Sequence, residues 1–364
     1  MVDNTREILQ RLSTTMFMCS IMLGMVPLLL MDSGGTGTTS IYHLGTNMTI
    51  TNTHRVHSAH QPPQDIGSNF YPKLGPYSSL DPAVLSTHMG MISGAGIGVV
   101  SVSWYPPGMS DENGPPSDRA IPLILDAAAK YGVKVCLHIE PYNNRSVENI
   151  RTNLAYVHTA YSNHPAYYKR KVGQKLLPVF YIYDSYLIHP LQWQRLLSSH
   201  GDLSIRGTDL DGVFLGLLVE FKHRDDIKTA GFDGFYTYFA SSRFSYGANW
   251  EHWADLAGFA QRFSLLFVPS VGPGYMDTRI RAWNSRNTAE REGGGYYQRG
   301  WRTAVTAGCE VVSITSFNEW GEGTMIEPAI SYNYSGYNYQ YYHQDNHQLY
   351  LQLTKSWVEQ FSIQ

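Results

Sequence analysis

Residues 311–328 read "VVSITSFNEWGEGTMIEP", an apolar β-branched run that leads straight into Glu319, Glu322 and Glu327. The first half has the composition of a buried strand. Only 16% of the 364 residues are charged, so three acids directly after such a strand are notable. The stretch therefore predicts a buried strand whose carboxyl end carries reactive carboxylates.

The same form recurs upstream, where short β-branched or aromatic runs alternate with helical stretches. The helical stretches include residues 117–132, 249–263 and 294–308. Continuous apolar strands that alternate with helices predict a parallel sheet covered by helices. Six further runs share the pattern: "IGVVSVSWYP" (97–106), "VKVCLHIEPY" (133–142), "LPVFYIYDSY" (177–186), "DGVFLGLLVE" (211–220), "GFDGFYTYF" (231–239) and "SLLFVPSVGPGY" (264–275).

Nearly every run ends in an aromatic or charged residue, which favours a barrel. An active (β/α)₈ barrel gathers such groups at the carboxyl ends of its strands, whereas a doubly wound sheet concentrates them at one switch point. Seven strands are clear, but closure needs eight. The candidates for the remaining strand, "TSIYHL" (39–44) and "NMTITN" (47–52), are weak. We predict a (β/α)₈ TIM-type barrel whose first strand is atypical or missing.

Glu319 and Glu322 are the candidate catalytic pair. Their spacing brings both carboxylates to one side if the loop opens as a helical turn. Two carboxylates in different environments are the basic equipment of glycoside hydrolysis. Glu140 points the same way as His138 and is a third candidate, as a hydroxyl-binding group. Glu327 lies outside this geometry, and we interpret it as structural or solvent-facing.

No metal or cofactor is predicted. His138, Glu140 and Glu319 could in principle form a metal site, but the chain has no HExxH or other ligand spacing. Cys19, Cys136 and Cys309 are too few and too far apart for a disulfide framework.

Other site candidates lie at neighbouring strand ends. Tyr183 and Asp184 face opposite ways on an alternating strand, so one of them is expected to be structural. Arg281 is a candidate clamp for a sugar or a carboxylate, with Arg279 as an equal rival. The aromatic candidates around the carboxylates are Trp104, Tyr238 and Trp320.

The N-terminal segment predicts secretory targeting. Arg6 and Arg11 precede the apolar run Met16–Met31, which fits a signal anchor better than a cleaved signal peptide. The alternative is an irregular or buried apolar segment, because the run is short for a membrane span. The sequons at Asn47, Asn144 and Asn333 suit a luminal chain.

These features predict an anchor and stem over residues 1–60 and a catalytic barrel over 61–364. The net charge of −3 gives no basic footprint for nucleic acid. No obligate protein partner is evident from the sequence.

Long motifs in the chain closely resemble the glycoprotein endo-α-1,2-mannosidases from about Gln61 onwards. They include "PPQDIGSNFYPKLGPYSSLDP" (62–82), "SWYPPGMSDENGPPSD" (103–118), "FYIYDSY" (180–186), "GFDGFYTYFAS" (231–241), "PSVGPGYMDTRIRAWN" (269–284) and "SITSFNEWGEGTMIEPA" (313–329). The resemblance implies a (β/α)₈ barrel on a Golgi membrane anchor with its catalytic domain in the lumen. It also implies retaining cleavage of an internal α-1,2-mannosidic bond in glucosylated high-mannose N-glycans, which releases glucosyl-mannose.

The resemblance also implies roles for individual residues. Glu319 acts as a base on the 2-hydroxyl of the substrate, which attacks the anomeric carbon, and Glu322 protonates the departing oxygen. Glu140, Tyr238 and Arg281 form the hydroxyl-binding shell. Trp104 and Tyr105 are similar to the aromatic floor of the glucose-side subsite.

Two departures from the family are visible. Gly321 stands where the family usually has His, and residues 1–60 contain no "YYxWY"-like aromatic first strand. A catalytically impaired, glycan-binding homologue or splice variant is therefore an alternative to an active enzyme. A barrel glycosidase with a different mannan substrate is a third interpretation.

Overall fold

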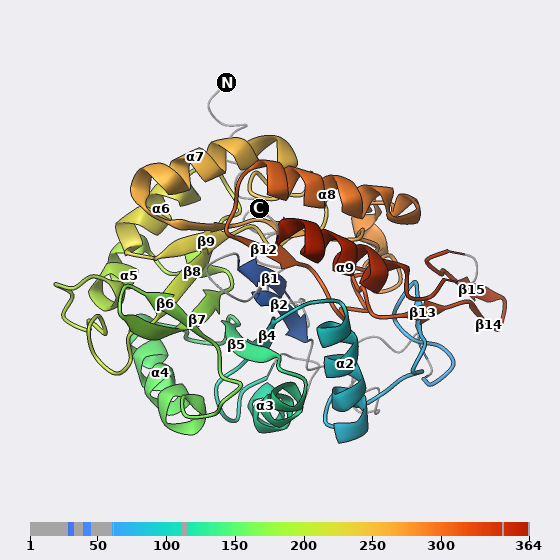
Figure 1. The fold of residues 1–364 in the computed structure, drawn as a ribbon, viewed down its shortest axis with the longest axis horizontal. Coiled ribbons are helices and arrows are strands. Elements are labelled where there is room, and N and C mark those ends of the chain that lie inside the picture. Colours follow the sequence, from blue (N-terminus) through green and yellow to red (C-terminus); the bar gives the residue numbers. More distant parts are fainter. Residues whose placement is uncertain are drawn as a thin grey trace.

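Eight parallel strands close into a barrel within the part of the chain that the structure describes. The computed structural model describes residues 28–32, 39–44, 60, 62–110, 116–343 and 346–362. Figure 1 shows the strands at the centre and the helices around them. In barrel order the strands are β2 (Thr39–Leu44), β4 (Val99–Trp104), β5 (Lys134–Ile139), β7 (Lys175–Ile182), β8 (Val213–Leu217), β9 (Gly234–Tyr236), the interrupted strand β10 (Leu266–Val268) and β11 (Ser270–Val271), and β12 (Val311–Ile314).

Strand β2 supplies the eighth position, so of the two predicted alternatives the first strand is atypical and not missing. Tyr42 is aligned with Val100 of β4, and Ile41 with Ser313 of β12, both in parallel pairing. The weak candidate 39–44 thus lies between the second and last strands of the barrel. The other candidate, 47–52, lies outside the described residues.

Strand β1 (Leu28–Asp32) runs antiparallel to β2, β4 and β12. Its residues 28–31 are the end of the apolar run for which the sequence predicts an anchor, and the rest of that run lies outside the described residues. Among the helices of the described chain, none is long and apolar enough to cross a membrane.

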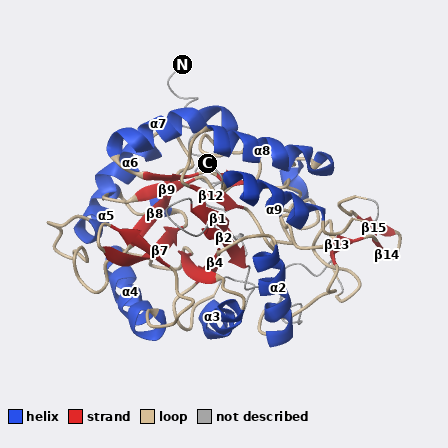
Figure 2. Cartoon of the chain, in the orientation of Figure 1, coloured by secondary structure: helices blue, strands red, loops and turns tan. Residues whose placement is uncertain are grey.

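The helices cover the outside of the barrel, as Figure 2 shows. Pro82 at the start of α2, with Asp81 as N-cap, and the Ser146–Asn149 capping box of α4 are local reasons for where these helices begin. The α-helices are α2 (Pro82–Gly94), α3 (Ile121–Lys130), α4 (Val147–Tyr161), α5 (Pro190–Leu197), α6 (His223–Ala230), α7 (Trp253–Phe263), α8 (Gly295–Thr306) and α9 (Leu349–Phe361).

Shorter elements decorate the barrel. A hairpin pairs β6 (Lys169–Val172) with the start of β7. A second hairpin joins β14 (Tyr332–Tyr334) to β15 (Tyr337–Tyr339), and β3 (Tyr71–Pro72) pairs with β13 (Ala329–Ile330). The 3₁₀ turns are η1 (Ser117–Ala120), η2 (Ser185–Leu187), η3 (Trp250–His252), η4 (Ala282–Asn287) and η5 (Glu292–Gly294).

The apolar core has a large cluster and a smaller one. The large cluster includes Ile124, Leu154 and Trp301 from the helices, packed against strand residues such as Val102. The smaller cluster consists mainly of strand residues, among them Leu215 and Tyr236. Cys136 and Cys309 are buried free thiols, as their apolar surroundings predict.

Candidate active site

The predicted catalytic pair lies on a tight turn directly after β12. Gly323 N–H donates to Trp320 O at 3.2 Å, which closes the turn, and Glu319 N–H is held by Ser316 Oγ at 3.0 Å. Glu322 is buried with 4% of its surface exposed, whereas Glu319 is half-buried. Both carboxylates interact electrostatically with Tyr238. The turn therefore brings the two acids to one region, with unequal access to solvent.

Gly323 has a conformational reason to be glycine. Its φ is +63°, and a Cβ there would lie 2.6 Å from Met276 O. Met276 N–H in turn donates to Glu322 O at 2.8 Å. This close approach fixes the catalytic turn against the loop that follows β11.

That loop brings a cation to Glu322. Arg281 Nη1 lies 3.2 Å from Glu322 Oε1 and 3.1 Å from Asp277 Oδ2. Burial raises the pKa of Glu322, and the charge of Asp277 adds to this, while Arg281 opposes it. The net direction is upward, because desolvation outweighs the effect of a guanidinium that is shared between two carboxylates. A raised pKa suits a carboxyl group that must hold a proton.

Glu140, at the end of β5, belongs to a chain of buried polar groups. Its Oε1 accepts from Ser103 Oγ at 2.8 Å and lies 2.6 Å from His138 Nδ1. His138 Nε2 lies 2.8 Å from the Tyr236 hydroxyl. When the Nδ1 proton points to Glu140, Nε2 accepts from Tyr236, so this chain holds the carboxylate in one orientation.

Tyr183 and Tyr238 line the same interior. Their rings meet edge to face with centroids 5.1 Å apart, and both lie within 7 Å of the His138 ring. Tyr238 has φ +57°, an unusual conformation for a bulky residue, and its buried hydroxyl has no hydrogen-bond partner within the described chain. A strained residue with an unsatisfied donor is what a ligand-binding position shows.

Asp184 is buried beside this cluster, and Tyr105 is buried at the end of β4. Asp184 Oδ1 accepts from the Tyr186 hydroxyl at 2.6 Å, and Arg145 donates to the Tyr183 and Asp184 carbonyls. These contacts fix the end of β7. Tyr105 follows β4, and its backbone N–H donates to Ser117 Oγ at 2.9 Å.

The two tryptophans predicted at the site lie in the core behind it. Trp104 has no exposed surface, and its indole N–H donates to Asp118 Oδ1 at 2.7 Å. Trp320 is 1% exposed and donates to Glu327 Oε2 at 3.1 Å. Both indoles pack in the large apolar cluster, with their N–H groups bonded to buried carboxylates.

Glu327 is fully buried, so the solvent-facing interpretation is wrong and the structural one holds. It accepts from the Tyr77 hydroxyl at 2.6 Å and from the Trp320 indole, and His88 Nε2 lies 3.1 Å away. His88 lies in α2 and Tyr77 in the segment before it, whereas Trp320 belongs to the catalytic turn itself. Glu327 thus ties the catalytic turn to the N-terminal part of the barrel.

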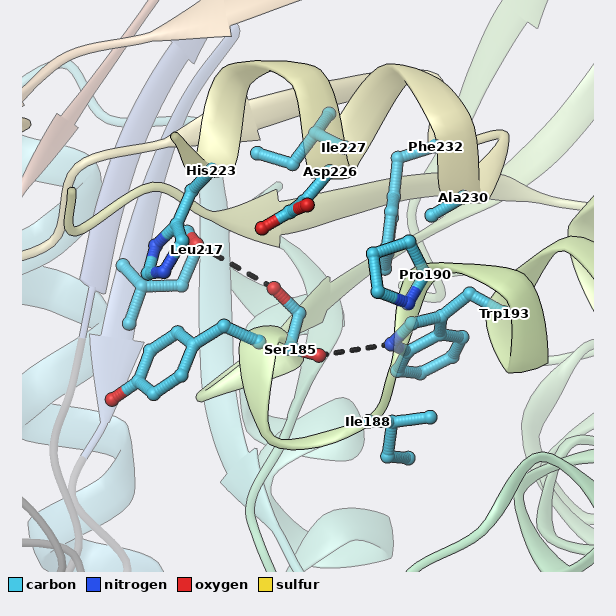
Figure 3. Close-up of a pocket in the computed structure, with 11 residues that line it drawn as sticks. Ser185, Ile188, Pro190, Trp193, Leu217, His223, Asp226, Ile227, Ala230 and Phe232 are labelled. Carbon is cyan, nitrogen blue, oxygen red and sulfur yellow. Dashed lines mark hydrogen bonds between the residues drawn. The ribbon is translucent and has the colours of Figure 1, made fainter. Parts of the chain in front are cut away.

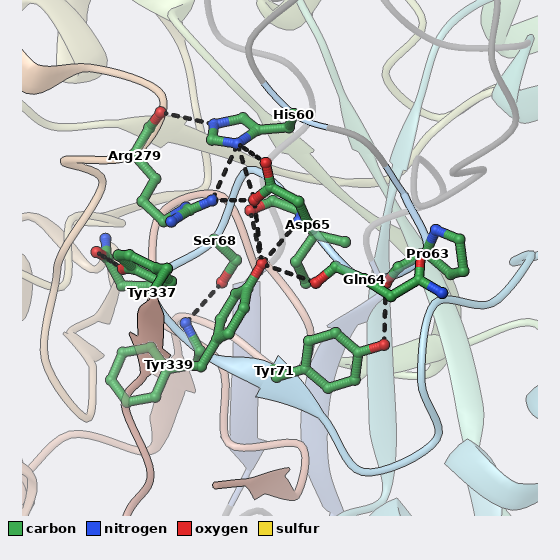
Figure 4. Close-up of polar contacts among 12 residues, drawn as sticks. His60, Pro63, Gln64, Asp65, Ser68, Tyr71, Arg279, Tyr337 and Tyr339 are labelled. Atoms are coloured by element: carbon green, nitrogen blue, oxygen red, sulfur yellow. Dashed lines mark hydrogen bonds and ion pairs between the residues drawn. The ribbon is translucent and has the colours of Figure 1, made fainter. Parts of the chain in front are cut away.

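Arg279 and Arg281 have separate roles, although they lie on the same loop. Figure 4 shows Arg279 turned toward His60 and Asp65. Arg279 forms an ion pair with Asp65. Its guanidinium also lies 3.7 Å from the centroid of the Tyr337 ring in hairpin β14–β15. Arg279 therefore clamps the outer segments together, and Arg281 is the residue that reaches the carboxylates.

A small pocket outside the barrel does not belong to this site. Figure 3 shows it between α5, α6 and β8, where Trp193, Ile227 and Phe232 contribute apolar walls. Its carboxylate, Asp226, comes from α6 and not from a strand end. The carboxylates of the candidate site, by contrast, follow the carboxyl ends of barrel strands, such as Glu140 after β5. No group of three or more metal-ligating side chains occurs within the described ranges.

The sequence does not single out Asp277 or Asn284, and it marks Tyr275 only as the aromatic residue that ends the run 264–275. Asp277 and Arg281 are spaced i, i+4, which is a local signal, but the contact of Arg281 with Glu322 joins residues 41 positions apart and cannot be read locally. His138 was noted beside Glu140, without its bond to Tyr236.

Comparisons with known proteins identify the family of the chain. The family described as glycosyl hydrolase family 99 matches residues 41–363. The chain is 52% identical to the glycoprotein endo-alpha-1,2-mannosidase of Xenopus laevis, covering 83% of this chain and 68% of the relative. It is 51% identical to the human glycoprotein endo-alpha-1,2-mannosidase-like protein, covering 83% and 66%. The chain thus spans about two thirds of the length of these relatives.

A solved structure is also similar. The GH99 endo-alpha-mannosidase of Bacteroides thetaiotaomicron superimposes with a TM-score of 0.77 at 42% identity, covering 84% of this chain and 89% of that one.

Proposed function

We propose that this member of glycosyl hydrolase family 99, which is a glycoside hydrolase by that membership, cleaves an internal α-1,2-mannosidic bond. Its substrates are glucosylated high-mannose N-glycans, and its product is glucosyl-mannose with retained configuration. The observation that carries the proposal is the pair Glu319 and Glu322, placed on one turn at a strand end but in unequal environments.

The proposed first step uses the substrate's own 2-hydroxyl group. Glu319 takes the 2-hydroxyl proton, the oxygen attacks the anomeric carbon, and the glycosidic bond breaks as Glu322 protonates the leaving oxygen. In the second step Glu322 takes a proton from water, which opens the 1,2-anhydro ring, and Glu319 returns its proton to the 2-oxygen. The pair therefore includes no enzyme nucleophile, unlike the common retaining scheme.

The remaining residues bind or position the sugar in this proposal. Arg281 orients Glu322, and Glu140 offers an acceptor for sugar hydroxyls. Tyr238 offers its unpartnered hydroxyl. The other proposed contributors to the substrate cavity are Tyr105, Tyr183 and Asp184, with Trp104 and Trp320 behind them.

Product analysis tests the function. The purified protein is incubated with a glucosylated high-mannose glycan, and the products are separated and identified. Release of glucosyl-mannose supports the proposal. Binding without turnover would favour the catalytically impaired homologue. The sequence of β2 gives a reason for such an impairment, because this strand lacks the family's aromatic first-strand motif. The absence of both binding and turnover would favour a different substrate.

We further propose that the protein is a single-pass Golgi membrane protein whose luminal catalytic domain comprises residues 61–364 together with strands β1 and β2. The basic residues before Met16–Met31 and the three sequons support this. Strands β1 and β2 belong to the preceding segment, yet they pair with the barrel. Fractionation of animal cells should recover the protein in membranes with glycans that an N-glycosidase removes. A cytosolic, unglycosylated product would contradict the proposal.

A further inference from the structure

Asp277 is a fully buried carboxylate whose hydrogen-bond partners come from its own loop. It lies on the loop after β11, four residues before Arg281. Its Oδ2 accepts from Tyr275 at 2.8 Å, Asn284 at 2.9 Å and Arg281 at 3.1 Å. Its Oδ1 has no hydrogen-bond partner among the described residues. So many donors on one oxygen fix the carboxylate in place.

The same guanidinium nitrogen contacts the proposed acid catalyst. Arg281 Nη1 touches both Asp277 Oδ2 and Glu322 Oε1, so one positive charge is shared by two carboxylates. We propose that Asp277 is a positioning residue that holds Arg281 against Glu322 and offsets its charge, so that Glu322 keeps the proton it gives to the leaving oxygen. This inference rests on the proposed function.

Electrostatics in a buried site favour this role for Asp277. A guanidinium alone beside a buried carboxyl group favours the ionised carboxylate. Glu322 would then have no proton to donate at neutral pH. With Asp277 ionised, the pair Asp277–Arg281 is neutral overall, and burial can keep Glu322 protonated, which agrees with the upward direction of its pKa.

Other groups around Glu322 do not replace this effect. The titratable groups near Glu322 are Tyr275 on the same loop, Tyr183 after β7, Tyr238 after β9, Glu319 on the catalytic turn and Glu140 after β5. Burial raises the pKa of all three of these tyrosines, so they are neutral over the working range. Arg281 is the cation that hydrogen-bonds to Glu322, so its compensation by Asp277 determines the balance.

The test is the pH profile of kcat/KM in Asp277→Asn, which keeps the shape and an accepting oxygen but removes the charge. The alkaline limb, where Glu322 loses its proton, should move to lower pH by about 1 unit, because an uncompensated cation lowers a carboxyl pKa by 1–3 units. Activity therefore falls at neutral pH and approaches the wild-type value on the acid side. Equal loss at every pH, with the limb unmoved, would overturn the proposal.

A matched control is Asp233→Asn. Asp233 also accepts from an arginine, Arg206 at 3.0 Å, and from a backbone N–H, but it lies at the start of β9, away from the site. This variant should leave the limb where it is. If Asp277→Asn does not fold, Arg281→Gln tests the same point with the opposite sign. It leaves Asp277 uncompensated beside Glu322, so the limb should move to higher pH, and no movement would contradict the proposal.

A second readout separates this inference from the proposed function. The infrared carbonyl band of a protonated carboxyl group can be titrated without substrate. It should disappear at lower pH in Asp277→Asn than in the wild type, even if the glycan proves to be the wrong substrate. An unchanged titration in an active enzyme would reject the role of Asp277 alone.

Discussion

Glu322 and Glu327 lie five residues apart after the same strand, both buried, yet their surroundings differ in kind. Glu327 is held by neutral donors, the Tyr77 hydroxyl and the Trp320 indole, with His88 beside it. Glu322 contacts a shared guanidinium and lies near the unpartnered hydroxyl of Tyr238. Burial alone therefore does not distinguish a catalytic acid from a structural one. The partners do, because saturated hydrogen bonding leaves no capacity for a substrate.

The largest expected effect is on turnover at the catalytic turn. Glu319→Gln and Glu322→Gln should each lower kcat by at least ~10²-fold, the scale for removing a positioned acid or base. Both variants should keep the fold, because glutamine has the shape of glutamate and keeps an accepting oxygen. Steady-state kinetics and circular dichroism check this. A variant that retains wild-type turnover would show that its residue is not part of the pair.

The next effect is on stability. Glu327→Gln replaces one acceptor oxygen with an amide NH₂ that faces existing donors, which should cost about 1–3 kcal/mol of unfolding free energy. The turnover of the folded fraction should change far less than in Glu322→Gln. Denaturant unfolding measures the loss, and Glu220→Gln, at an exposed position, is the control. A stable Glu327→Gln with lost turnover would reverse the contrast between the two glutamates.

The contrast also marks what the sequence could and could not reveal. The runs 97–106 to 309–320 predicted seven strands and the position of the carboxylates, because strand periodicity and strand-end chemistry are local. The partners of Glu327 were hidden, since Tyr77 and His88 lie some 240 residues away in the chain.

Strand β2 shows the same limit. Its residues 39–44 form a weak local pattern, and their position is fixed by pairing with Ser313 and Val100, which no local rule contains. The fates of Trp104 and Trp320 were equally hidden, because an aromatic residue at a strand end can face the cavity or the core.

The smallest expected effect concerns the outer side of the loop that carries Arg281. Arg279→Ala removes the ion pair with Asp65 and the stacking on Tyr337, both at partly exposed positions. The expected loss is about 1 kcal/mol of unfolding free energy, decreasing with added salt. Because Arg279 points away from Glu322, kcat should stay close to the wild-type value. Arg279→Lys, which keeps the charge but loses the planar stacking group, should fall between the two. If Arg279→Ala instead lowers kcat without loss of stability, the contacts of Arg279 with Asp65 and Tyr337 help to position Arg281. In that case the two arginines do not have separate roles, one structural and one at the catalytic site.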